Sequence, residues 1–159
     1  TITRLLETFK QPVLVEEYLP GREVTVGILG TGPRARVLGA MDVVLGPSAE
    51  QGVYSYDNKQ RYVGRVDYRI LRPGDADLAE VEGLALSAWR ALGCRDAGRV
   101  DLRADATGAF HFIEANPLAG LHPVISDLAI LAGQAGLSYA DLIGCIMTSA
   151  FERAEPVRI

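Results

Sequence analysis

The chain has 159 residues, 48% of them apolar and 23% charged, a composition typical of one soluble globular domain with a core of its own. This balance excludes intrinsic disorder. No apolar run approaches the roughly 18 residues of a membrane-spanning helix, so no membrane association is expected. Sixteen Lys and Arg against twenty Asp and Glu give a net charge of −4, which argues against binding to nucleic-acid phosphates.

The first half of the sequence predicts one short helix followed by a meander of strands. Residues 3–10 favour a helix that Pro12 ends, and an extended run begins at Val13. β-branched and apolar runs predict three strands, at residues 24–29, 36–44 and 63–71. Residues 45–62 form a loop rich in Gly, Ser and Tyr, and loops of this length tend to be functional.

The second half predicts helices around one β-hairpin. A helix over residues 78–92 has apolar residues at helical spacing, and Gly93 follows where a C-terminal cap belongs. The hairpin strands are residues 99–103 and 110–114. Two more helices are expected, one capped at Ser126 and one opened by a capping box at Ser138. Because strands and helices come in irregular blocks, the fold class is α+β, with a largely antiparallel sheet flanked by helices.

The hairpin gathers polar side chains on one face of the sheet. If residues 106–109 form its loop, Asp101 falls directly opposite Glu114. Since side chains alternate along a strand, Arg99 shares the face of Asp101, and Asn116 shares the face of Glu114. The other face is expected to hold Leu102, Ile113, Ala115 and His111, the last as a packed structural histidine.

Two carboxylates placed opposite each other repel, so a positive group should lie between them. A hard divalent cation suits the oxygen ligands of Asp101, Glu114 and Asn116. Mg²⁺ prefers one or two carboxylates together with substrate phosphates, so a nucleotide is the expected partner. The alternative is a solvated strand face on which Arg99 bridges the two acids and nothing binds.

Two other segments are candidates for ligand contact. Glu16 and Glu17 end an apolar strand, and the backbone there offers hydrogen bonds for an adenine edge, while Glu23 could accept from both ribose hydroxyls. The alternative is an ordinary surface turn with solvated acids. In residues 53–62 aromatic and polar residues alternate, which suggests either a lid with Lys59 as a point charge for phosphate or a surface turn.

Taken together and in this order, four segments resemble the ATP-grasp family, and most closely the D-alanine–D-alanine ligases and their relatives. They are residues 15–26, 92–101, 112–117 and 135–139. The likeness runs over nearly the whole chain but covers only about the C-terminal half of such an enzyme. It implies that residues 1–159 are the C-terminal part of the ATP-binding domain, without the N-terminal substrate domain and the lysine-bearing ATP subdomain. The start at Thr1, with neither initiator Met nor signal peptide, suggests a cut through a longer chain.

The resemblance also implies a role for individual residues. In the nucleotide site, Glu16 would accept from the adenine amino group, the backbone of Glu17, Tyr18 and Leu19 would line the adenine slot, and Glu23 would hold the ribose. In the magnesium site, two Mg²⁺ ions, or Mn²⁺ in their place, would be bound by Asp101, Glu114 and Asn116. In catalysis, Lys59 would contact the γ-phosphate, and Arg99 with the backbone near Gly120 would stabilise the oxyanion of a tetrahedral intermediate.

The function that the resemblance implies is an ATP-dependent carboxylate–amine ligase that acts in peptidoglycan precursor synthesis for the cell wall. A carboxylate attacks ATP to give an acyl-phosphate, and an amine then displaces phosphate. The expected partners are ATP, amino acids and the remainder of the chain, without nucleic acid or membrane; a homodimer is compatible with the resemblance. Two cysteines, too few for a disulfide scaffold, favour the cytoplasm. This fragment alone is not expected to catalyse the reaction.

The sequence departs from the D-alanine ligases around the second substrate. Residues 116–123 lack the Thr-Ser-Pro-Gly-Met-Thr type of loop, and the serine that anchors the substrate carboxylate aligns with Ile125 or Ser126. His122 is a further candidate for contact with a substrate carboxylate, and Gln60 replaces the tyrosine that often follows the phosphate-contacting lysine. The alternatives are therefore a ligase for another amino acid or a peptide, or a non-catalytic module that binds nucleotide or cation.

Overall fold

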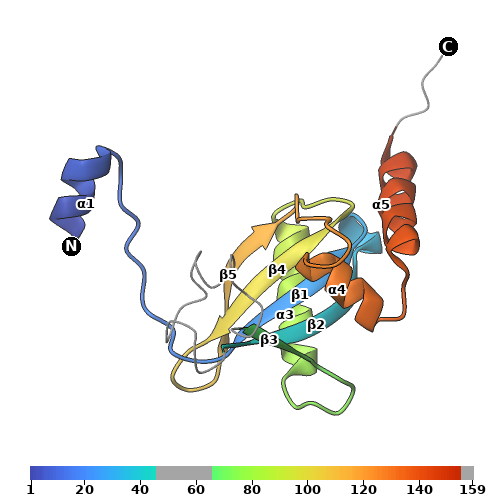
Figure 1. The fold of residues 1–159 in the computed structure, drawn as a ribbon, viewed down its shortest axis with the longest axis horizontal. Coiled ribbons are helices and arrows are strands. Elements are labelled where there is room, and N and C mark those ends of the chain that lie inside the picture. Colours follow the sequence, from blue (N-terminus) through green and yellow to red (C-terminus); the bar gives the residue numbers. More distant parts are fainter. Residues whose placement is uncertain (46–65, 155–159) are drawn as a thin grey trace.

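The computed structural model describes residues 1–45 and 66–154, and its centre is one five-stranded sheet (Figure 1). The strand order is β3-β2-β1-β4-β5, and all neighbouring strands are antiparallel. The strands are β1 (Glu23–Leu29), β2 (Arg36–Leu45), β3 (Val66–Ile70), β4 (Ala97–Ala104) and β5 (Phe110–Asn116). The predicted α+β class and antiparallel meander are confirmed.

The helices lie around this sheet and at the N-terminus. They are α1 (Ile2–Phe9), the short 3-10 helix η1 (Gly32–Arg34), α3 (Leu78–Ala91), α4 (Asp127–Gln134) and α5 (Tyr139–Arg153). Within the described ranges, no helix is by itself long and apolar enough to cross a membrane. By length and composition α4 and α5 qualify only as a pair, and that pair is bent by 108°.

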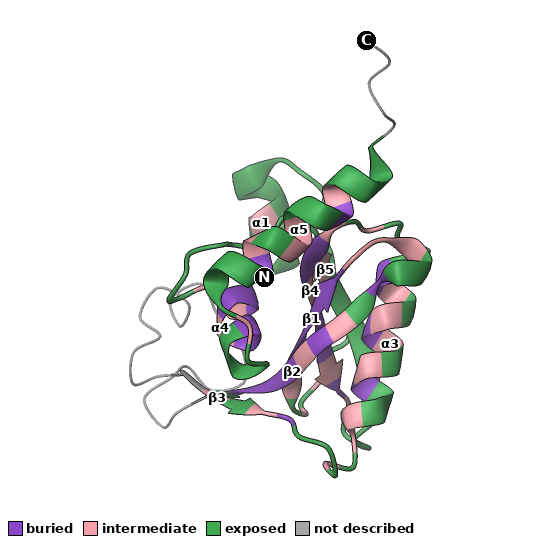
Figure 2. Ribbon diagram, turned by 90° about the vertical axis from the view of Figure 1, so that its right-hand side faces the viewer, coloured by how far each residue is buried: buried purple, intermediate pink, exposed green. Residues whose placement is uncertain are grey.

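One face of the sheet packs against α3. Alternate residues of β1, such as Val24, Val26 and Ile28, point to this face and are fully buried. They meet a stripe on α3 that includes Val81 and Trp89, which are also fully buried. In Figure 2, α3 and α4 lie on opposite sides of the sheet, and their buried residues face it. The larger core cluster therefore lies between α3 and this face, which we call the back of the sheet, and stabilises the sheet there.

The other face is covered by α4 at one end. A side chain on Gly27 would meet Leu131 at 3.1 Å and Leu128 at 3.3 Å, so the missing Cβ lets the helix approach β1 closely. Leu128 and Leu131 are both 1% exposed and belong to a second core cluster. The apolar contacts thus lie at one end of this face, and the polar residues of the hairpin lie at the other.

Polar contacts define the start of α5 and hold its far end against Asp96. At its N-terminus the predicted capping box is confirmed: Asp141 donates its N–H to Ser138 Oγ, and Ser138 donates its N–H to Asp141 Oδ2, both at 3.1 Å. Further along, the Asp96 carboxylate accepts from Arg153 and from Ser149 Oγ at 3.0 Å. The Arg153 guanidinium is the main reason that the pKa of Asp96 lies below its ordinary value.

The N-terminal segment differs from the prediction. The predicted helix is confirmed as α1, but the extended run from Val13 onward is not a strand. Leu14 and Val15 are 80% and 65% exposed, and the segment extends from the sheet to α1, which lies apart from the other elements (Figure 1). A strand forms only beside a partner, and no described strand pairs with this segment, so its apolar sequence remains unpaired.

The close contact between β4 and α3 predicts opposite effects of alanine at two glycines. A Cβ on Gly98 would collide with the Asn116 carbonyl oxygen and lie 2.6 Å from the Trp89 ring, whereas one on Gly83, exposed in α3, would meet nothing within 4 Å. We expect Gly98→Ala to lower the free energy of unfolding by about 1–3 kcal/mol. Gly83→Ala should raise it by roughly 0.5–1 kcal/mol. Urea unfolding measures both, and equal changes would contradict this packing.

Candidate functional site

The β4–β5 hairpin forms the centre of the site. Asp101 pairs with Glu114, and Arg99 pairs with Asn116, as the sequence predicts. Residues directly opposite each other in an antiparallel pair point to the same face, so four polar side chains converge on one surface. The expected juxtaposition of the two carboxylates is confirmed.

The hairpin reaches this register by a different route from the predicted one. Ala104 pairs with Phe110, so the loop spans residues 105–109 instead of 106–109. A bulge then shifts the register between Asp101 and Leu102, which leaves Ile113 as the extra residue of β5. Ile113 is 49% exposed, so its predicted place in the core is wrong; the bulge releases it from the alternation.

The same bulge changes the position of His111. His111 pairs with Arg103, which lies two residues from Asp101 on the unbulged strand, so His111 points to the same face as Glu114. Its ring nitrogen lies 3.0 Å from Asp105 Oδ2, and its side chain is 50% exposed. The predicted packed histidine on the far face is therefore wrong, because one extra residue reverses the alternation of the strand.

Asp101 is the buried member of the acidic pair. It is 7% exposed, its Oδ1 accepts from Thr25 Oγ1 at 2.9 Å, and its Oδ2 lies 3.3 Å from Arg99. Burial is the main cause that raises the pKa of Asp101, and the negative charge of Glu114 raises it further. Arg99 and the Thr25 hydroxyl act in the opposite direction. The fold thus maintains a carboxylate in a place that disfavours its charge, and a cation would relieve that cost.

Asn116 lies between the two acids. Its amide nitrogen donates to Glu114 Oε1 at 2.9 Å and lies 3.4 Å from Asp101 Oδ2. Among the described residues, no cluster of three or more His, Cys, Asp or Glu could bind a metal by itself. Two carboxylates and one amide are too few for a closed protein site, but they fit Mg²⁺ that completes its shell with phosphate oxygens and water. The donor set therefore fits a nucleotide-bound magnesium ion.

Arg99 is held by two carboxylates, of which the sequence predicted one. Besides Asp101, its guanidinium forms an ion pair with Asp127, the first residue of α4. The side chains of Arg99 and Asp127 are only 16% and 11% exposed. Among the described residues, the Arg99 Nε–H is buried without a hydrogen-bond acceptor. The guanidinium is therefore fixed in one orientation by its two carboxylate partners.

The predicted substrate residues form one compact loop. Ser126 is the N-cap residue of α4, but its Oγ makes no cap hydrogen bond and instead accepts the His122 N–H at 2.9 Å. The His122 Nδ1 in turn accepts the Val124 N–H at 3.2 Å. A Cβ on Gly120 would lie 2.9 Å from Ser126 Oγ, so the two residues are close neighbours in this loop. Gly120, His122 and Ser126 are thus brought together beside Asp127.

The predicted adenine segment lies at the hairpin. Glu16, Glu17 and Leu19 line a cavity of about 290 Å³ together with residues of β5 and its turn. Glu23 and Arg103 are paired across β1 and β4, with Glu23 Oε2 3.2 Å from an Arg103 nitrogen. The Arg103 guanidinium also lies over the Tyr18 ring, 5.6 Å from its centroid. Five predicted nucleotide residues thus lie around one end of the sheet, and Lys59 lies outside the described residues.

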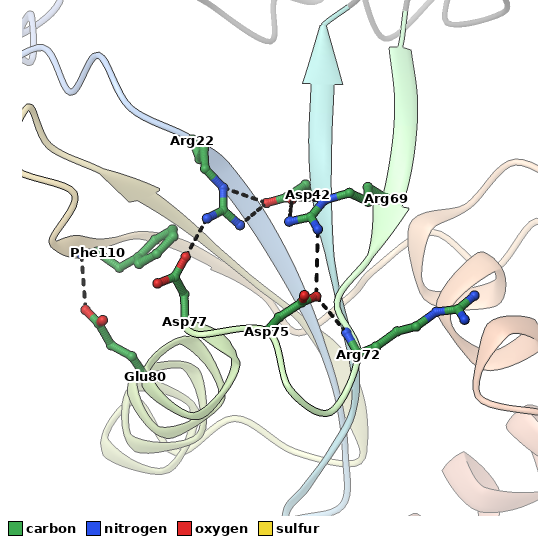
Figure 3. A network of polar contacts seen from close by, with 8 residues as sticks. All are labelled: Arg22, Asp42, Arg69, Arg72, Asp75, Asp77, Glu80 and Phe110. Carbon is green, nitrogen blue, oxygen red and sulfur yellow. Dashed lines mark hydrogen bonds and ion pairs between the residues drawn. The ribbon is translucent and has the colours of Figure 1, made fainter.

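A second polar network fixes the start of β1 from behind (Figure 3). Arg22 donates to Asp42 Oδ1 at 2.8 Å and forms an ion pair with Asp77, while Arg69 lies 2.6 Å from Asp42 Oδ2. The Asp42 hydrogen bond is the main reason that the pKa of Arg22 is raised. Arg22 also lies over the Phe110 ring, 5.8 Å from its centroid. The network therefore connects β1, β2, β3, β5 and α3 directly beside Glu23.

The residues of the candidate site that sequence reasoning missed are Thr25, Arg103 and Asp127, which contact Asp101, Glu23 and Arg99. Asp127 follows the predicted cap of a helix, where an acid commonly stabilises the helix dipole, so its sequence position alone does not indicate an ion pair. Thr25 and Arg103 lie on predicted strands at polar positions of an otherwise apolar pattern. Once strand pairing is known, their alternation with buried neighbours is the signal that places them on the face of Asp101.

The raised pKa of Asp101 predicts a pH-dependent effect of Asp101→Asn. Because the folded state favours the protonated acid, the wild type loses stability relative to this variant as pH rises above about 4. Asp105 provides a control of opposite sign. Hydrogen bonds from Thr107 and His111 lower its pKa, so the wild type gains stability relative to Asp105→Asn over the acid range as pH rises. Urea unfolding between pH 3 and 7 measures both; parallel curves for Asp101→Asn and the wild type would contradict the burial effect.

The buried ion pair of Arg99 predicts a large cost for Asp127→Ala. Removal of Asp127 leaves a mostly buried guanidinium with one carboxylate fewer, so we expect the free energy of unfolding to fall by about 3 kcal/mol. Glu152→Ala is the matched control. The side chains of Arg34 and Glu152 are 63% and 47% exposed, so their ion pair should contribute less than about 0.5 kcal/mol to stability. A similar small loss for both variants in denaturant unfolding would show that Asp127 is dispensable.

Comparison with known proteins places this chain in a family. Residues 2–148 match the family model described as the D-ala D-ala ligase C-terminus. A D-alanine–D-alanine ligase of Bordetella petrii is 37% identical over 143 residues, and one of Synechococcus is 31% identical over 154 residues. The first match covers 89% of this chain and 42% of its relative, and the second covers 97% of this chain and 45% of its relative. The chain thus spans less than half the length of these curated relatives.

Solved structures agree on the fold. The D-alanine–D-alanine ligase from Bacillus anthracis complexed with ATP has a TM-score of 0.72 at 21% identity, over 95% of this chain and 46% of that one. The VanG D-Ala:D-Ser ligase from Enterococcus faecalis has a TM-score of 0.63 at 21% identity, over 84% of this chain and 37% of that one. The family match extends over nearly all of the sequence, and the described sheet and helices have the architecture of these enzymes. The chain therefore belongs to the family of D-alanine–D-alanine ligase C-terminal domains, with the ATP-grasp fold.

Proposed function

We propose that this chain is the ATP- and magnesium-binding C-terminal part of a ligase that joins two amino acids, most closely a D-alanine–D-alanine ligase. The observation that supports this function best is the Asp101–Glu114 pair, with Asn116 between the acids and Arg99 beside them. Such an activity takes place in the cytoplasm and supplies a dipeptide for peptidoglycan precursors. The nucleotide, the amino acids and the remainder of a longer chain are its proposed partners.

The magnesium ligands in this proposal are Asp101, Glu114 and Asn116. Asp101 is fixed by Thr25, and Glu114 is exposed, so one ligand is rigid and the other is accessible from solvent. The Asn116 side chain can turn to present its oxygen in place of the nitrogen that now bridges the acids. When bound, Mg²⁺ supplies positive charge that shields the phosphate oxygens of ATP and favours phosphoryl transfer to a carboxylate. Mn²⁺, an oxygen-preferring ion, is a proposed substitute.

Arg99 and the loop of Gly120 act on the reacting group in this proposal. Arg99 is fixed between Asp101 and Asp127, so its charge is oriented before the substrate binds. Such a fixed cation stabilises negative charge that develops on an acyl-phosphate or on the oxyanion formed when an amine attacks it. The loop that contains His122 and Ser126 adjoins this position through Asp127, which supports a role in holding the carboxylate of the second amino acid.

The nucleotide base and ribose occupy the other end of the face in this proposal. Glu16 accepts from the adenine amino group, the backbone of residues 17–19 lines the slot, and Glu23 holds the ribose. Support comes from the cavity beside Glu16 and Glu17 and from the position of Glu23 on the same face as Asp101. Lys59, which lies between β2 and β3 in the sequence, is proposed to contact the γ-phosphate.

A longer polypeptide completes the enzyme in this proposal. The relatives are more than twice as long as this chain, and the N-terminal substrate domain and the lysine-bearing ATP subdomain would lie in their additional length. The exposed apolar residues of α1, Ile2, Leu6 and Phe9, support contact with such a part. A homodimer remains part of the proposal for the whole protein.

The full-length protein tests this function. With ATP, Mg²⁺ and D-alanine we expect phosphate release together with dipeptide, and a panel of other amino acids and peptides identifies a different second substrate. Asp101→Asn and Glu114→Gln should each lower kcat at least about 100-fold, because each removes a metal ligand. Glu152→Gln, an exposed acid on α5, is the control and should retain activity.

Two outcomes would contradict the proposal. One is the absence of ATP-dependent phosphate release with every amino acid and peptide tested, although the protein is folded. The other is full activity of both acid variants. The chain of residues 1–159, assayed in parallel, is expected to give no dipeptide.

A further inference from the structure

Arg103 occupies a position that the proposed mechanism does not use. It lies on β4 two residues beyond Asp101, so its side chain points to the same face as the proposed magnesium ligands. The side chain is 15% exposed, which is low for an arginine at the edge of a polar face. It is thus a second nearly buried guanidinium on this face, and Asp101 lies between it and Arg99 along β4.

Arg103 connects two segments that are proposed to bind different parts of the nucleotide. One guanidinium nitrogen lies 3.2 Å from Glu23 Oε2, and the guanidinium carbon lies 5.6 Å from the centroid of the Tyr18 ring. Glu23 is proposed to hold the ribose, and Tyr18 belongs to the proposed adenine segment. Arg103 therefore forms a physical link from the base slot to the ribose carboxylate.

A cavity adjoins Arg103 and Glu23. A cavity of about 570 Å³ is lined by Glu23 and Arg103, together with Pro20 and Gly21 of the turn between the two segments. This volume falls in the range of about 300–1,000 Å³ that is common for small-molecule sites. The Glu23 side chain is 21% exposed, so its carboxylate remains accessible to a ligand in spite of its contact with Arg103.

We propose that Arg103 is a positioning residue for the nucleotide. It holds the Glu23 carboxylate and the Tyr18 ring so that Glu23 accepts hydrogen bonds from the ribose hydroxyls. The inference rests on the proposed function, because it requires a ribonucleotide in this slot. A carboxylate has about four lone-pair positions on two oxygens. Arg103 donates to Oε2, and the Glu23 side chain is 21% exposed, so a ribose hydroxyl can still reach this carboxylate.

The physical reason for an arginine here is orientation. The planar guanidinium donates from a rigid fork and packs its face on an aromatic ring, whereas a lysine offers a point charge on a flexible stem. With Arg103 in place, the Glu23 side chain loses few conformations when the nucleotide binds. Without it, the carboxylate would turn to water, and the hydrogen bonds to the ribose would weaken.

The experiment compares ATP with 2′,3′-dideoxy-ATP on the full-length protein with Mg²⁺. Dissociation constants are measured for the wild type, Arg103→Met and Arg103→Lys. We expect the wild type to bind ATP at least about 10-fold more tightly than the dideoxy nucleotide, because the latter cannot donate to Glu23. Arg103→Met should reduce this ratio to about 2-fold or less, mainly by weakening ATP. Arg103→Lys should lower it at least about 3-fold.

Control variants separate positioning from a general loss of structure. Arg72→Met removes an exposed guanidinium that points away from the polar network (Figure 3), and it should retain the wild-type ratio. In a Glu23→Gln background, Arg103→Met should change the ratio no further, since the carboxylate that it positions is already absent. A purely structural role of Arg103 would weaken both nucleotides equally and leave the ratio unchanged.

The outcomes distinguish this inference from the proposed function. If the wild type binds both nucleotides equally, the ribose role of Glu23 fails, and with it the nucleotide placement in the proposed function. If the wild type discriminates and both Arg103 variants keep its ratio, the inference about Arg103 alone is overturned. Should Arg103→Met fail to fold, the Arg103→Lys ratio decides the matter.

Discussion

The repulsion between two carboxylates on neighbouring strands is the constraint on which the rest of this site depends. Asp101 and Glu114 face each other across β4 and β5, and burial makes the charge on Asp101 costly. The fold compensates with Thr25, Arg99 and Asn116, each of which contacts Asp101. These groups hold the carboxylates in place, and in the proposed function the same few residues also bind the cation.

One face of the sheet packs against α3 and supports the fold, and the other face carries the polar residues of the candidate site. Behind the sheet, α3 packs on fully buried residues such as Val26 and Trp89, and the Arg22–Asp42 network fixes the point where β1 begins. In front, α4 covers only the end at Gly27 and contributes Asp127 to the orientation of Arg99. The polar end of that face is consequently rigid, although few apolar contacts are available there. Rigid support of this kind is what an electrostatic site requires, because its groups need no reorganisation when charge develops.

Sequence reasoning succeeded where short-range patterns decide the structure and failed where distant segments meet. Period-two alternation with a four-residue turn placed Asp101 opposite Glu114, because the longer turn and the bulge of the real hairpin cancel, and the capping box located the start of α5. Val13 to Val15 have strand propensity, but no described strand pairs with them, so propensity alone misassigned them. Arg103 and Asp127 pair with residues 80 and 28 positions away, a separation that no local pattern encodes.

The bulge at Ile113 and the turn of residues 105–109 compensate for each other. With this turn, a regular ladder would place Glu114 opposite Val100 and direct it toward α3; the bulge restores it to the face of Asp101. A hairpin with a turn one residue shorter and no bulge would reach the same pairing of Asp101 and Glu114. The hairpin can therefore accommodate the loss of one residue from its turn without displacing Asp101 and Glu114 from each other.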